Sequence, residues 1–210
     1  MKSVFIEKSL GVDIREGSVF LTLVGKKLRT VEVLAGKTIT LKPLTGKDEK
    51  AEKHFLNKVN RFLIDHDTWP ESVVVSLPRS YVTFKTFELP APDMESVRSM
   101  VEFELERQFS AGLEDLYFTF QVTPKAENIF HVASATIKKE IANYYLELIQ
   151  KLNLKTTILD VSTFANVNLA FAQDIKNDSP IWALADISPE TLDIALIKND
   201  AIEFSRSLSW

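Results

Sequence analysis

The feature that most constrains the fold of this chain is a similarity between its beginning and its end. VDIREGSVFLTLVGKKLRTVEV, near the N-terminus, aligns without a gap with ADISPETLDIALIKNDAIEFSR, near the C-terminus. Asp13 and Ile14 then fall on Asp186 and Ile187, and Ser18 falls on Thr191. The second turns, at residues 25–27 and 198–200, also coincide. Two unrelated β-hairpins would share apolar alternation, so the alternative to a duplication is a chance match.

The segments after the first hairpin indicate what is duplicated. Residues 3–41 have short apolar runs broken by turn signals at 15–17, 25–27 and 35–37, which predicts a meander of three or four strands. Residues 47–67 predict an amphipathic helix, and SVVVSL at 72–77 predicts a parallel strand buried on both faces. A duplicated unit of meander, helix and buried strand is typical of actin and sugar kinases, whose two related domains face a nucleotide cleft.

The middle of the chain has the order βαββαβ, which predicts an inserted ferredoxin-like module. A further helix is expected from residue 162 or 163 to 172, then a loop at 177–180, and β structure from 181 onward. The expected elements of the module are strands at 81–89, 116–122, 130–137 and 155–161 and helices at 93–109 and 138–152.

Composition excludes several classes of protein. The net charge of −4 and the scattered lysines and arginines do not fit a nucleic-acid binder. The chain has no cysteine, so disulfides and thiolate chemistry are excluded. Glu7 and Lys8 interrupt the first apolar run too early for a signal peptide, and no stretch reaches the length of a membrane span. We therefore expect a cytoplasmic protein.

Four segments in this order resemble the PilM and GspL family, the actin-like cytoplasmic proteins of type IV pilus assembly and type II secretion. The resemblance covers nearly the whole chain. It implies an α/β, actin-like (ribonuclease H-like) fold with an inserted ferredoxin-like subdomain and a truncated second actin-like domain. The implied boundaries are 1–80 with 160–178, 81–159, and 180–210. The four segments are SLPRSYVTFKTFELP, VEFELERQFSAGLEDLYFTFQV, YYLELIQKLNLKTTILDVSTFANVNLAF and LADISPETLDIALIKNDAIEFSRSL.

The resemblance also raises the question of ATP with Mg²⁺. Phosphate binding by a hairpin needs backbone N–H groups close to the anion, which favours glycine. Family members thought to bind ATP have glycine directly after Asp-Ile, where this chain has Arg15. The corresponding turn of the C-terminal hairpin, after Asp186 and Ile187, is Ser188-Pro189-Glu190, which contains no glycine. The candidate nucleotide residues of this degenerate site are Asp13, Arg15, Ser18, Asp186 and Thr191; the alternative is that both aspartates only cap their turns.

The function implied by the resemblance is a non-catalytic scaffold peripheral to the bacterial inner membrane. Its expected partners are a membrane-anchored assembly protein and an assembly or secretion ATPase. In the pilus proteins the partner's tail lies in a groove, which we expect here between residues 76–84 and the helix at 93–109. The alternatives are an actin-like ATPase and a cell-division actin relative. The candidate partner-binding residues are Ser76, Arg79, Tyr81, Phe84, Arg98 and Glu102.

No residue pattern predicts catalysis or a metal site. The three histidines, His54, His66 and His131, are far apart and belong to no metal-binding motif. Glu102 and Glu106 share one helix face, where Arg98 and Arg107 offset them, so a solvated surface is the expected role.

Overall fold

The computed structural model describes residues 7–44, 46, 48–109, 112–175 and 179–210. These residues form two compact units. The first runs to Pro78 and includes Asn143–Asn166, and the second contains Arg79–Ala142 and Val167–Trp210. Parts of three predictions lie outside the described residues: residues 3–6 of the meander, residue 47 of the first helix, and residues 177 and 178 of the loop.

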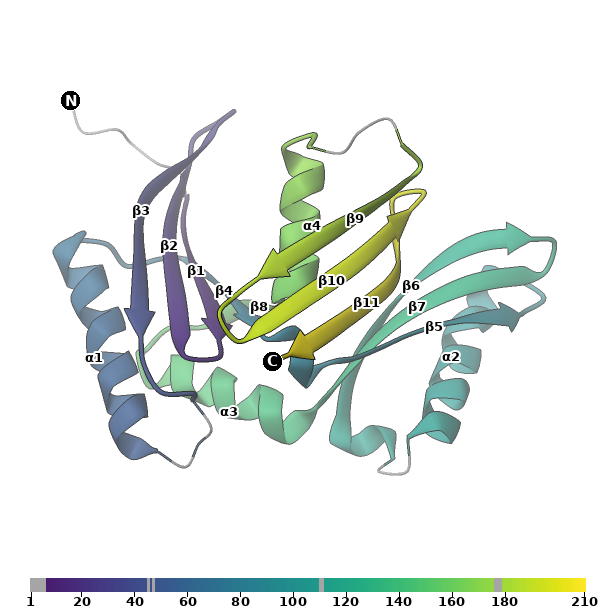
Figure 1. Ribbon diagram of the computed structural model, residues 1–210, viewed down its shortest axis with the longest axis horizontal. Helices are drawn as coiled ribbons and strands as arrows, with labels where there is room; N and C mark the ends of the chain where they lie inside the picture. Colours follow the sequence, from purple (N-terminus) through teal and green to yellow (C-terminus); the bar gives the residue numbers. More distant parts are fainter. Residues whose placement is uncertain (1–6, 45, 47, 110–111, 176–178) are drawn as a thin grey trace. The chain divides into compact units, whose positions relative to one another are not determined.

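The first unit is built on a five-stranded sheet with the order β3-β2-β1-β4-β8 (Figure 1). The predicted buried strand pairs in parallel with β1 on one side and with β8 on the other, which confirms parallel pairing for this strand, whereas β1, β2 and β3 are antiparallel. The strands are β1 (Glu7–Arg15), β2 (Ser18–Lys26), β3 (Val31–Thr40), β4 (Ser72–Leu77) and β8 (Thr156–Val161).

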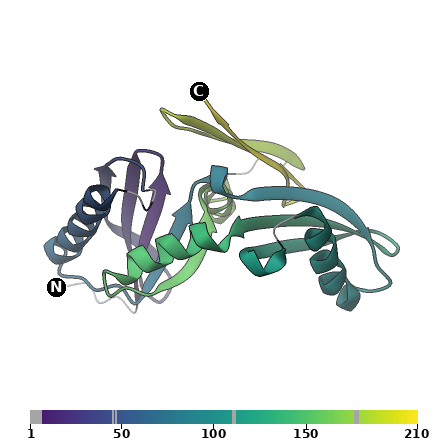
Figure 2. The same cartoon turned by 90° about the horizontal axis from the view of Figure 1, so that it is seen from below.

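Helix α1 (Glu49–Asp65) lies against this sheet (Figures 1 and 2). Asp48 caps its N-terminus by accepting hydrogen bonds from the N–H groups of Lys50 and Ala51. Burial of its apolar stripe contributes roughly 1.5–3 kcal/mol per large side chain. Tyr145, on α3 (Lys139–Gln150), donates from its hydroxyl to the carbonyl of Leu44 at 2.7 Å. The buried stripe of α1 is Phe55, Val59, Phe62 and Leu63.

One predicted turn of the first meander is wrong. The structure has no break at residues 35–37, because β3 runs through Gly36 and pairs along its length with β2. Glycine weakens a strand but does not by itself end one when the residues before and after it are paired with the neighbouring strand, as Ala35 and Lys37 are here. The meander therefore has three strands.

The second unit contains a three-stranded sheet with the order β5-β7-β6, and Figure 2 shows helix α2 (Met94–Gln108) on one face of it. Asp93 caps α2 by accepting from the N–H of Ser96 at 2.8 Å, as its position in the sequence predicts. The core between helix and sheet includes Val97, Val101 and Leu105. The elements are η1 (Arg79–Tyr81), β5 (Thr83–Pro90), η2 (Leu113–Asp115), β6 (Leu116–Ala126) and β7 (Ile129–Lys138).

The inserted module is smaller than predicted. The strand expected at 155–161, which is β8, pairs in parallel with β4 in the first sheet and not with β5, β6 or β7. The sheet of the insert therefore consists of β5, β7 and β6, without the fourth strand of a ferredoxin-like module. The order of elements alone does not tell which of two sheets a strand joins, and this is the cause of the error. The predicted domain boundaries stay a prediction.

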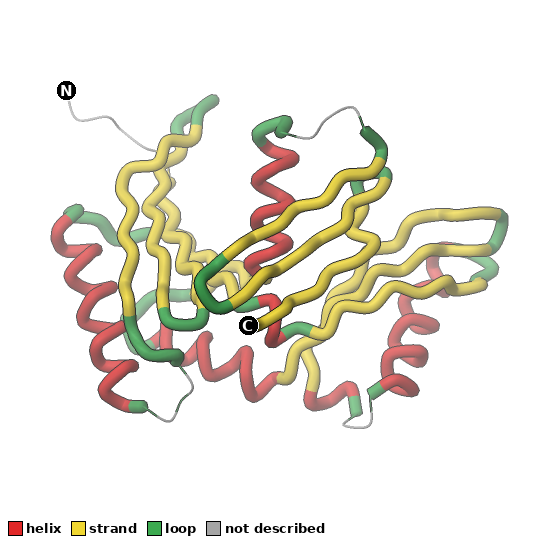
Figure 3. The backbone as a smooth tube through the Cα atoms, viewed as in Figure 1, coloured by secondary structure: helices red, strands yellow, loops and turns green. Residues whose placement is uncertain are grey.

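The second unit also contains a meander with the order β11-β10-β9 (Figures 1 and 3). Its strands are β9 (Ile181–Ile187), β10 (Thr191–Lys198) and β11 (Ala201–Ser209). The C-terminal part of helix α4 (Ser162–Ala172) packs on one face. That core consists of Val167, Ala195 and Ile197, with Phe171, Trp182, Leu184 and Ile202 around it.

The backbone supports the alignment of the two meanders. Asp13 is opposite Phe20 in the first hairpin, and Asp186 is opposite the aligned Asp193 in the second. Each meander also has a register shift between its second and third strands, at Leu23/Val24 and at the aligned Leu196/Ile197. A matching bulge is not a consequence of apolar alternation, so it favours duplication over chance.

Candidate functional site

The first candidate hairpin holds its charged residues against each other. Arg15 Nε donates to Asp13 Oδ2 at 2.8 Å, and both side chains are partly buried. Gly17 has φ of 82°, a left-handed conformation that makes the tight turn between β1 and β2. Ser18 starts β2, opposite Arg15 and Thr40. The Arg15 cation neutralises the Asp13 carboxylate, which weakens this carboxylate as a ligand for Mg²⁺.

The second candidate hairpin uses a hydroxyl where the first uses glycine. Ser188 Oγ accepts hydrogen bonds from the N–H groups of Glu190 at 3.4 Å and Thr191 at 2.9 Å. Trp210 Nε1 donates to the carbonyl of Pro189 at 2.7 Å. The turn N–H groups that would face an anion are therefore engaged inside the turn. Asp186 lies near the end of β9, half-buried, and Thr191 begins β10.

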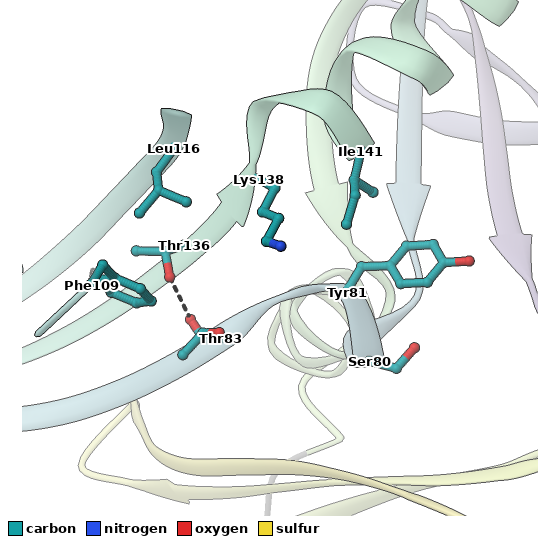
Figure 4. Close-up of a pocket in the computed structure, with 8 residues that line it drawn as sticks. All are labelled: Ser80, Tyr81, Thr83, Phe109, Leu116, Thr136, Lys138 and Ile141. Carbon is teal, nitrogen blue, oxygen red and sulfur yellow. Dashed lines mark hydrogen bonds between the residues drawn. The ribbon is translucent and has the colours of Figure 1, made fainter. Parts of the chain in front are cut away.

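A pocket of about 360 Å³ lies in the second unit, where η1 leads into β5 (Figure 4). Its wall combines aromatic and aliphatic side chains with hydroxyls and one ammonium group. Thr136 Oγ1 donates to the carbonyl of Thr83 at 3.4 Å within this wall. Lys85 Nζ lies 5.2 Å from the centre of the Phe109 ring. The lining residues are Ser80, Tyr81, Thr83, Phe109, Leu116, Thr136, Lys138 and Ile141.

The pocket lies partly where the partner groove was predicted. Ser80, Tyr81 and Thr83 belong to the segment 76–84, and Phe109 ends the predicted helix range. No sequence pattern indicates the remaining walls. They come from the start of β6, the end of β7 and the start of α3, and only the three-dimensional pairing of these strands brings them together. These missed residues are Leu116, Thr136, Lys138 and Ile141.

Of the six predicted partner-binding residues, Tyr81 alone lines this pocket. Ser76 is buried in β4 of the other unit. Arg79 is buried and bonded within the second unit, so it is not exposed for direct contact with a partner. Phe84 is half-buried, with the Arg79 guanidinium carbon 5.9 Å from its ring centre. Arg98 and Glu102 form an ion pair at 3.2 Å on the surface of α2.

The model of the family of the type IV pilus assembly protein PilM matches residues 11–210. The chain belongs to this family. None of the curated protein sequences compared with this PilM-family chain matches it. Among the described residues, no helix is both long and apolar enough to cross a membrane.

Solved structures confirm the actin-like fold. A chain of the PilM-PilN type IV pilus biogenesis complex superimposes with a TM-score of 0.80 at 20% identity, over 96% of this chain and 61% of that one. The cytoplasmic domain of EpsL, an inner-membrane component of the Vibrio cholerae type II secretion system, superimposes with a TM-score of 0.62 at 14% identity. The match covers 96% of this chain and 71% of that one.

A Bacteroides thetaiotaomicron protein with an actin-like ATPase fold and unknown function gives a TM-score of 0.52 at 11% identity, over 97% and 70% of the two chains. The resemblance to PilM and GspL proteins and the predicted actin-like architecture are thus confirmed. The PilM-family chain spans about three fifths of the PilM-PilN chain that it matches.

Proposed function

We propose that this chain is a non-catalytic scaffold of a type IV pilus or type II secretion platform. It works on the cytoplasmic side of the bacterial inner membrane and binds a short segment of a membrane-anchored, PilN-like partner. An assembly ATPase is its second partner. The observation that carries this proposal is the pocket beside η1, in a chain of the PilM family whose matching solved relative is part of a PilM-PilN complex.

The chemistry of the pocket fits a peptide better than a small charged metabolite. Tyr81, Phe109, Leu116 and Ile141 provide apolar surface for one or two anchoring side chains. The hydroxyls of Ser80 and Thr83 in the wall can exchange hydrogen bonds with an extended main chain. The pocket is too small for a folded partner, so the anchor is a short segment.

The test is calorimetric titration of a synthetic peptide, the N-terminal cytoplasmic segment of a PilN-like partner, into the chain. Tyr81→Ala and Ile141→Asp should each weaken binding by at least about thirtyfold, since truncating a buried anchor contact costs roughly 2 kcal/mol or more. Glu106→Ala, at an exposed position on the surface of α2, is the control and should stay within about twofold. Unchanged affinity in Ile141→Asp would place the partner elsewhere.

We further propose that the two hairpins do not hold Mg·ATP, so the chain acts without nucleotide turnover. The Arg15–Asp13 ion pair supports this, as does the use of the turn N–H groups by Ser188 Oγ. Proline at 189 also removes one backbone donor from the second turn.

Titration of Mg·ATP up to millimolar concentration should give no heat of binding. Micromolar binding that disappears in Asp13→Ala would overturn the proposal and favour an actin-like ATPase. Asp115→Ala, an exposed carboxylate of η2 in the second unit, serves as the control for a general charge effect.

A further inference from the structure

A buried polar cluster joins the wall of the pocket to the C-terminal meander. Arg79 begins η1 and is 6% exposed. Its Nε donates to Ser205 Oγ at 2.6 Å and its Nη2 donates to the Ser205 carbonyl at 2.7 Å. Its Nη1 donates to the carbonyl of Val82. One side chain thus holds η1, the residue between η1 and β5, and strand β11 together.

The electrostatics show that this cluster is costly to disturb. Burial lowers the pKa of Arg79, and the charge of Asp193 opposes that shift. Asp193 is itself 5% exposed and accepts a hydrogen bond from Ser207 Oγ at 2.5 Å. A buried guanidinium is tolerated only when its donors are paired and a counter-charge is near. Loss of one acceptor leaves a charged donor unsatisfied in the interior.

The cluster lies next to the pocket on one side. Arg79 directly precedes Ser80 and Tyr81, which line the pocket, and the carbonyl that it holds belongs to Val82, between Tyr81 and the lining residue Thr83. The bonds of Arg79 therefore fix the backbone that carries three lining side chains.

On its other side the cluster reaches the second candidate hairpin. Asp193 is the cross-strand neighbour of Asp186 and lies on the same strand as Thr191. Ser205 is paired with Ala195 across β10 and β11. The pocket wall and the C-terminal meander thus share one set of buried bonds.

We propose that Arg79 is a positioning residue that couples the pocket wall to the C-terminal meander. A peptide segment bound in the pocket orders the meander, and an ordered meander preorganises the pocket. This inference rests on the proposed function. By linkage the coupling is reciprocal, so weakening the bond on the meander side lowers affinity in the pocket although no lining residue changes. The rigid guanidinium fork transmits the effect because it bonds both sides at once.

The variant that tests the coupling is Ser205→Ala, which removes the acceptor of Arg79 Nε and leaves the strand in place. The matched control is Ser209→Ala, the same change at an exposed position of the same strand. The readouts are the affinity for the PilN-like peptide and amide hydrogen exchange, with and without that peptide. Exchange follows residues 80–83 in the pocket wall and 201–209 in β11.

We expect Ser205→Ala to bind the peptide about tenfold more weakly and to exchange faster at residues 80–83 even without peptide. In the unchanged chain the peptide should slow exchange in β11. Arg79→Lys should behave like Ser205→Ala, because lysine keeps the charge and loses the fork. Ser209→Ala should match the unchanged chain in every readout.

The outcomes separate this inference from the proposed function. If the peptide does not bind the unchanged chain but Ser205→Ala still accelerates exchange at 80–83, the proposed function fails and the positioning role stands. If Ser205→Ala leaves exchange at 80–83 as it was, or if it binds peptide with unchanged affinity while β11 does not respond to the peptide, the coupling is wrong.

Discussion

The two meanders share a backbone design but differ in what happens to one face. In the first meander, Ile14 is 2% exposed and Leu23 is 2% exposed. The aligned residues of the second meander are of identical type, yet Ile187 is 74% exposed and Leu196 is 38% exposed. The same apolar alternation predicts a buried face in both meanders, but the side chains of that face are buried only in the first meander. Apolar alternation specifies a face suited to burial, and a neighbouring element such as α1 decides whether burial occurs.

The largest expected effect comes from these identity-matched pairs. Ile14→Ala and Leu23→Ala should each lower the free energy of unfolding by about 2–5 kcal/mol, because each leaves a cavity in a closed core. Ile187→Ala and Leu196→Ala should each cost less than about 1 kcal/mol, because their side chains are already in contact with water. Urea denaturation followed by circular dichroism gives the four values.

Equal losses at Ile14 and Ile187 would break this comparison. They would mean that the face of the second meander is covered in solution. Phe20→Ala supplies a control inside the first meander, since Phe20 is exposed on the opposite face of β2 and should cost little for its size.

The turns give a second, smaller contrast. Gly17→Ala should cost roughly 1–2 kcal/mol, because an L-residue with a side chain is strained at positive φ. Ser188→Ala should cost about 1 kcal/mol, because its Oγ satisfies two backbone N–H groups of the other turn. Thermal unfolding measures both. Glu190→Ala, at the position aligned with Gly17, should leave the unfolding midpoint within about one degree, and a large drop there would show that the turns are built alike.

The smallest effect is expected at Arg15, which is aligned with Ser188. Arg15→Ala removes a partly exposed ion pair with Asp13 and should change the free energy of unfolding by less than about 1 kcal/mol. The change should shrink further in 0.5 M salt, which screens the pair. A loss above about 2 kcal/mol in denaturant titration would contradict this and give Arg15 a larger structural role than Ser188.

The sequence predicted those elements whose signals are local. The parallel strand Ser72–Leu77, the N-cap Asp93 and the repeated Asp-Ile hairpins were found from apolar runs, capping residues and alignment. Prediction from the sequence failed for features that depend on the pairing of strands far apart in the chain. Strand β8 joins β4 and not the insert, and β3 continues through Gly36 because its partner β2 is unbroken.

The same limit applies to the candidate site. The sequence indicates Tyr81, which lies in a segment that resembles the family, but Lys138 and Ile141 reach the pocket only through the end of β7 and the start of α3. For Arg79 the sequence does not reveal burial. A charged residue beside a predicted groove suggests surface contact, and only the fold reveals that its donors are used inside.

The matching bulges suggest how the history of this fold can be traced. A side chain changes with one nucleotide substitution, whereas an extra residue in a ladder shifts the register of every pair beyond it. The shifts at Leu23/Val24 and Leu196/Ile197 coincide in the alignment although most of the flanking side chains differ. Where two amino-acid sequences are too divergent to align, a shared irregularity of the backbone still indicates common descent. It also offers a fixed point from which the two halves of related proteins can be superimposed.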